Sequence, residues 1–106
     1  MSKKKEVPLK KVINQLLRAY GYNDMLDEID LMKAYDEVVG VMFVKHTVKK
    51  FYKNRILFVQ LDSAVLKQEM SYMKTTLVLK INQMLGKQIL KDIIIKWKHL
   101  KTYNLS

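Results

Sequence analysis

The sequence of 106 residues contains no cysteine and only two histidines, His46 and His99. The lack of cysteine excludes disulfides and thiolate metal sites, and two isolated histidines argue against a zinc or haem site. Long apolar runs are missing too, since no stretch of the chain approaches the roughly 18 apolar residues that a membrane span requires. The basic start at Met1 to Lys5 leads into Glu6-Val7-Pro8 and not into an apolar signal core. We therefore expect a cytoplasmic protein that makes no membrane contact and whose fold depends on packing alone.

Glycine and proline are also scarce, with three glycines and one proline in the whole chain. Gly21, Gly40 and Gly86 stand alone, so there is no glycine-rich loop of the kind that holds phosphates. The sequence contains no recognisable catalytic triad, because His46 lies beside Thr47 and a lone histidine in this setting is typical of packing or hydrogen bonding. The sequence therefore predicts that the protein is not an enzyme and uses no cofactor, metal or small-molecule substrate.

Acidic residues are few and unevenly placed. Lysine and arginine number 20 against 10 aspartates and glutamates, which gives a net charge of +10. Six of the acids lie between Asp24 and Glu37, where Lys33 is the only base, so this segment carries −5 and the rest of the chain +15. Acids in the first turns of an exposed helix explain the cluster better than a metal site does. The strong positive charge of the rest of the chain favours a polyanionic partner. A surface whose charge serves only to keep the protein soluble is the alternative.

The spacing of apolar residues predicts one α+β domain over residues 7–100, between a disordered basic tail at 1–6 and a short tail at 101–106. Glycines and capping residues mark the helix ends, and β-branched and aromatic residues mark the strands. The expected elements are a helix from Pro8 to Tyr20, a helix from Asn23 or Asp24 to Gly40 or onward through Val44, strands at 47–52 and 56–61, a long helix from Asp62 or Ser63 to Gly86, and a strand at 89–98. The predicted order is α-α-β-β-α-β.

This order implies a three-stranded sheet with helices on one face, in which the long helix returns the chain to the sheet. If Leu57, Val59 and Leu61 face the helices, the alternate residues of the same strand face outward. The residues expected on this open face are Ile56, Phe58, Gln60, Ile94, Lys96 and Lys98. Apolar and aromatic groups would then lie among lysines.

Such a face suits nucleic acid, because aromatic rings can stack on bases while lysines neutralise phosphates. The hairpin also concentrates basic residues that could follow a phosphate backbone. The candidate nucleic-acid-binding residues are Lys45, Lys49, Lys50, Lys53, Arg55, Phe58, Lys96 and Lys98. Two other readings stay open: lysines on an edge strand also prevent aggregation, and Phe58 could pack beneath a further element.

Several segments of the chain carry a family resemblance by their order and spacing. They are Tyr35–Gly40, Val44–Thr47, Arg55–Val59, Asp62–Met70, Ile81-Asn82, Gly86 and Ile93–Lys96. Together they resemble the bacterial DciA family of replicative helicase loaders. The resemblance implies a KH-like fold, DNA binding and contact with the DnaB-type replicative helicase. The chain departs from the family in having Tyr35 where tryptophan is usual and Val65 where tryptophan is frequent. It also lacks the GxxG loop with which KH domains grip nucleic acid, so any DNA-binding surface must lie elsewhere.

Three hypotheses for function follow. The first is an accessory protein of DNA replication that holds single-stranded or forked DNA on the hairpin lysines and the open sheet face. The second is a protein-interaction module in which Phe58 and Ile94 form an apolar patch, and the third is an RNA-binding, ribosome-associated KH-like protein. Phosphate-driven binding weakens steeply with salt whereas an apolar interface does not, and RNA specificity needs contacts to the 2′-hydroxyl.

Overall fold

The computed structural model describes residues 8–97 of the chain. The elements are α1 (Pro8–Ala19), α2 (Asn23–Val39), α3 (Val41–Lys45), β1 (Thr47–Lys53), β2 (Ile56–Leu61), α4 (Ala64–Tyr72), α5 (Lys74–Leu85) and β3 (Asp92–Trp97). This arrangement confirms the α+β class. The tails expected at 1–6 and 101–106, and the candidate residue Lys98, lie outside the described residues.

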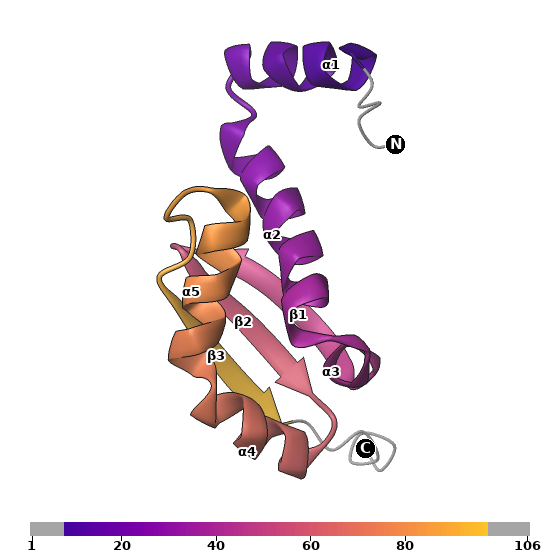
Figure 1. Ribbon diagram of the computed structural model, residues 1–106, viewed down its shortest axis with the longest axis vertical. Coiled ribbons are helices and arrows are strands. Elements are labelled where there is room, and N and C mark those ends of the chain that lie inside the picture. Colours follow the sequence, from indigo (N-terminus) through magenta and orange to yellow (C-terminus); the bar gives the residue numbers. More distant parts are fainter. Residues whose placement is uncertain (1–7, 98–106) are drawn as a thin grey trace, which may run out of the picture.

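The sheet has the order β1-β2-β3, with the central strand β2 antiparallel to β1 and parallel to β3. The parallel pair is joined by the crossover through α4 and α5, as the sequence predicts. Helix α2 packs on α5, and α4 and α5 both contact β3, so these helices cover one face of the sheet (Figure 1). The expected helix layer on one side of the sheet is therefore confirmed for the described part of the chain.

The core fills the space between this helix layer and the sheet. The large side chains that are fully buried there are Leu31, Tyr35, Leu57, Val59, Leu61, Met70, Ile81, Leu90 and Ile93. Tyr35 is the largest of them, and its hydroxyl lies 3.0 Å from Oγ1 of Thr47. Because the Thr47 hydroxyl donates its proton to the carbonyl of Phe43 at 2.7 Å, Tyr35 must be the donor. Burial raises the pKa of Tyr35 above its ordinary value.

Of the two ends predicted for the second helix, the structure shows the one at Gly40. The helix ends at Val39, and Gly40, with φ of 89°, separates it from the short helix α3. The expected long third helix is broken at Met73 into α4 and α5, although no glycine or proline lies between Ser63 and Gly86. The break lets α4 contact the strands while α5 packs on α2. Tertiary packing has therefore overridden a continuous helical pattern.

The last strand begins at Asp92 rather than at the predicted Ile89. Ile89 and Leu90 are buried in the loop before it, and Asn82 of α5 holds them there. Its Oδ1 accepts the N–H groups of Ile89 at 3.0 Å and Leu90 at 2.9 Å, and its Nδ2 donates to the carbonyl of Leu90 at 2.8 Å. These bonds satisfy the backbone groups that a strand would otherwise have paired.

Candidate nucleic-acid interface

The hairpin turn determines which side chains share the uncovered face of the sheet. Asn54 and Arg55 both have positive φ, at 52° and 67°, as in the two-residue type I′ turns that join antiparallel strands. This turn pairs Lys53 with Ile56, and the pairing continues in register back to Lys49. Residues two apart along each strand point to the same side, so the positions on the uncovered side follow directly.

We call this uncovered side the outer face. It consists of Lys49, Phe51 and Lys53 from β1, Ile56, Phe58 and Gln60 from β2, and Asp92, Ile94 and Lys96 from β3. The strand pairing arranges them in three rows across the sheet. A polar row of Lys49, Gln60 and Lys96 lies next to an apolar row of Phe51, Phe58 and Ile94. The predicted outward orientation of β2 and β3 is thereby confirmed for the described residues.

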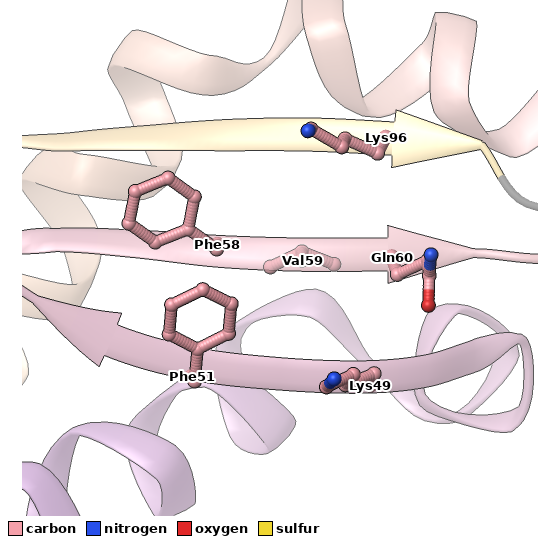
Figure 2. Close-up of a pocket in the computed structure, with 6 residues that line it drawn as sticks. All are labelled: Lys49, Phe51, Phe58, Val59, Gln60 and Lys96. Atoms are coloured by element: carbon pink, nitrogen blue, oxygen red, sulfur yellow. The ribbon is translucent and has the colours of Figure 1, made fainter.

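The two phenylalanines of the apolar row form a stacked pair. Their ring centroids are 4.7 Å apart and the rings are within 9° of parallel. Beside them is an open hollow of about 290 Å³, which Lys49, Gln60 and Lys96 also line (Figure 2). Phe51 is 44% exposed, so the aromatic pair is accessible to solvent. An accessible aromatic surface next to lysine amino groups can receive a flat, anion-bearing ligand such as a nucleotide.

The outer face is positively charged. Within residues 8–97, Lys49, Lys53 and Lys96 take part in no ion pair, and each is exposed. The carboxylate on this face, that of Asp92, is paired with Lys74 at 3.7 Å. The acidic segment belongs to α2, which lies on the other side of the sheet (Figure 1). The acidic cluster and the lysines of the outer face therefore lie on opposite sides of the sheet.

The other candidate residues lie apart from this surface. Lys50 points to the helix side, where its amino group is 2.6 Å from a carboxylate oxygen of Asp36 and 4.8 Å from the centre of the Tyr35 ring. Arg55 lies in the turn and donates to the carbonyl of Gln88 at 2.8 Å, while Lys45 is exposed at the end of α3. The structure thus brings together Lys49, Lys53, Phe58 and Lys96, and assigns Lys50 and Arg55 internal partners.

Phe51 is the aromatic member of the outer face that the candidate set omits. The sequence carries a signal for it, because a two-residue turn at Asn54 and Arg55 places Phe51 opposite Phe58. Taking Lys53 as part of the turn, instead of as the last residue of the strand, hid that pairing. The observed strand β1 includes Lys53.

Nothing in the described part of the chain resembles a metal centre, since residues 8–97 hold no cluster of three or more potential metal-ligating side chains.

His46 has the hydrogen-bonding role expected of it, with Nδ1 at 2.7 Å from Oδ1 of Asp62. The neighbouring Ser63 hydroxyl accepts the N–H of Leu66 and so caps α4. Of the helices within residues 8–97, none is both long and apolar enough to cross a bilayer.

Comparison with protein families gives one decisive result: residues 8–95 match the model of the family described as "Dna[CI] antecedent, DciA". The chain belongs to the DciA family. This match covers every described element through most of β3 and confirms the resemblance seen in the sequence. Comparisons with curated proteins and with solved structures returned no match.

DciA proteins are associated with loading of the DnaB replicative helicase, and the family is not one of known enzymes. Within residues 8–97, this DciA domain has its helices on one side of a three-stranded sheet, and no described element covers the other side. Tyr35, which we expect to stand where the family usually has tryptophan, is a core residue with a hydrogen bond to Thr47. Tyrosine therefore fills the position as a packing residue whose polar end has a partner.

Proposed function

We propose that this protein is a non-enzymatic accessory factor of bacterial DNA replication, which acts in the cytoplasm and binds single-stranded or forked DNA on its outer face. In this role it assists the loading of the DnaB-type replicative helicase. Family membership supports the link to the helicase. The single observation that supports the DNA site is the stacked pair of Phe51 and Phe58, flanked by Lys49 and Lys96, which take part in no ion pair with the described residues.

Single-stranded DNA fits this surface better than a duplex does. Unpaired bases expose flat π-faces that can stack on Phe51 or Phe58, whereas the bases of a duplex are already stacked on each other. Lys49 and Lys96 lie on the two outer strands, one on each side of Gln60, where they can neutralise successive phosphates. The contacts are to π-faces and phosphates, so we expect little preference for base sequence.

Salt-dependent binding to labelled oligonucleotides tests the proposal. The natural protein should bind single-stranded and forked DNA, and the logarithm of its affinity should fall linearly with the logarithm of salt concentration. Replacing Lys49, Lys53 and Lys96 together by glutamate should abolish binding at moderate salt. Replacing the same three lysines by neutral glutamine should reduce the slope of log affinity against log salt concentration by about 2, since each phosphate contact to a single strand contributes about 0.7.

A matched control uses lysines of the helix side. Lys33 and Lys80 are exposed on α2 and α5, respectively. The pair Lys33→Glu and Lys80→Glu therefore changes net charge by the same amount as the pair Lys49→Glu and Lys96→Glu, without altering the outer face. This control should keep most of the DNA affinity. Equal losses in the two sets of variants would show that net charge, and not the outer face, governs binding.

A second candidate function uses the same apolar row. Phe51, Phe58 and Ile94 could pack against a protein, with the lysines serving only to steer the encounter. In that case DNA would not bind at low salt, while a protein complex would persist at high salt. Stronger binding to RNA than to DNA of the same sequence would favour the ribosome-associated alternative.

A further inference from the structure

Helix α1 carries an apolar stripe that the domain does not bury. Its members recur at spacings of three and four residues, which places them on one side of the helix. They are Leu9, Val12, Ile13 and Leu16, and Tyr20 continues the stripe just after the helix; between 47% and 73% of each residue is exposed. An amphipathic helix gains most of its stability from tertiary packing, so a stripe this exposed indicates a missing partner.

The helix projects from the rest of the domain. Figure 1 shows α1 lying across the end of α2, away from the sheet. It is held there by Arg18, which donates to Asn23 at 3.1 Å and lies 3.4 Å from a carboxylate oxygen of Asp27. Gly21, with φ of 91°, forms the turn between the two helices. The stripe is thus presented in a defined orientation and at a distance from the outer face.

Charge indicates what kind of surface covers the stripe. Helix α1 has three basic residues, Lys10, Lys11 and Arg18, and no acid, so its partner should combine apolar groups with carboxylates. The N-terminal half of α2 has this combination. Met25 and Ile29 are 44% and 43% exposed, and Asp24 and Glu28 lie beside them on the same helix.

We propose that the occupant is a second copy of this chain, with α1 of each copy docked along the exposed side of α2 in the other. Such an exchange is two-fold symmetric and buries both apolar stripes at once. The contact of Arg18 with Asp27 and Asp30 within one copy demonstrates the same pairing of an α1 base with α2 carboxylates. The inference uses neither the outer face nor the proposed binding of DNA.

Sedimentation velocity across a wide concentration range tests the docking. The natural protein should be in a monomer–dimer equilibrium. Leu16→Lys on α1 and Ile29→Lys on α2 should each weaken the dimer by at least about tenfold, because each places a charge in the apolar contact. Two controls add the same charge elsewhere on exposed positions: Asn14→Lys on the polar side of α1 and Leu79→Lys on α5. Both should dimerise as the natural protein does.

Mixing the two disrupted variants identifies the surfaces that meet. The Ile29→Lys copy keeps an intact α1, and the Leu16→Lys copy keeps an intact α2, so the mixture should form a heterodimer through one of the two reciprocal contacts. Normal dimerisation by Ile29→Lys alone would overturn the proposal in favour of pairing between two α1 helices. A natural protein that stays monomeric at every concentration would overturn it as well.

The same variants distinguish a failure of the dimer proposal from a failure of the proposed DNA binding. Both variants should keep the secondary structure of the natural protein by circular dichroism, because Leu16 and Ile29 are exposed in the single copy. Both should also bind single-stranded DNA in the anisotropy assay, since the outer face is unchanged.

Discussion

The strongest stability prediction concerns Asn82, which holds the loop that leads into β3. Replacing it by alanine removes the acceptor of the Leu90 N–H and the donor to the Leu90 carbonyl, and Leu90 is buried. The N–H of Ile89 keeps a second acceptor, the carbonyl of Lys87 at 3.0 Å. Each buried donor or acceptor left without a partner costs about 1–3 kcal/mol, so the loss of both Leu90 bonds in Asn82→Ala should lower the free energy of unfolding by about 2–5 kcal/mol. A domain of this size has only about 5–15 kcal/mol in total.

Urea denaturation measures this loss as a shift of the midpoint at constant slope. The exposed neighbour Gln83 provides the control, and Gln83→Ala should change the free energy of unfolding by less than about 0.5 kcal/mol. A loss below about 1 kcal/mol for Asn82→Ala would refute the reasoning, because it would mean that the loop finds other partners at no cost. The loop matters for the site, since it sets the register that brings Lys96 beside Gln60.

Three smaller predictions test the core, the sheet and the helix cap. Tyr35→Phe should cost about 1 kcal/mol below pH 10. It should also reduce the loss of stability that the natural protein shows as pH rises above the ordinary tyrosine pKa of 10.0, because the raised pKa of Tyr35 favours the protonated folded form. Part of that loss should remain, since burial raises the pKa of Tyr52 as well. Lys50→Glu should destabilise the domain by about 1–2 kcal/mol in thermal unfolding, because it places a carboxylate beside Asp36. Lys49→Glu, on the outer face, should leave the stability nearly unchanged. Equal effects of the two substitutions would contradict the assignment of Lys50 to the helix side and Lys49 to the outer face. Ser63→Ala should cost about 1 kcal/mol through loss of the cap of α4.

Elements that depend on local pattern could be predicted from the sequence. The alternation along Ile56–Leu61 and the capping residues Gly21, Ser63 and Gly86 gave the strand and the helix ends correctly. The outward positions of Phe58 and Lys96 followed from the same alternation. Period and capping are properties of neighbouring residues, which is why they can be recognised without a structure.

Features that depend on tertiary contacts could not be predicted. Strand β1 has lysines on both faces, so alternation alone does not reveal that Lys50 turns inward to Asp36 while Lys49 faces outward. The break at Met73 has no glycine or proline to signal it. The stripe of α1 has the periodicity of a core helix, and only the structure reveals that the domain leaves it exposed.

The most direct test of the central claim is an NMR titration of the ¹⁵N-labelled protein with short single-stranded DNA. We predict that the amide signals of the outer face shift, foremost those of Lys49, Phe51, Phe58 and Lys96, while those on the helix side, along α2 and α5, stay in place. Shifts concentrated on α2 and α5, or no shifts at low salt, would contradict the assignment of the outer face as the DNA-binding surface.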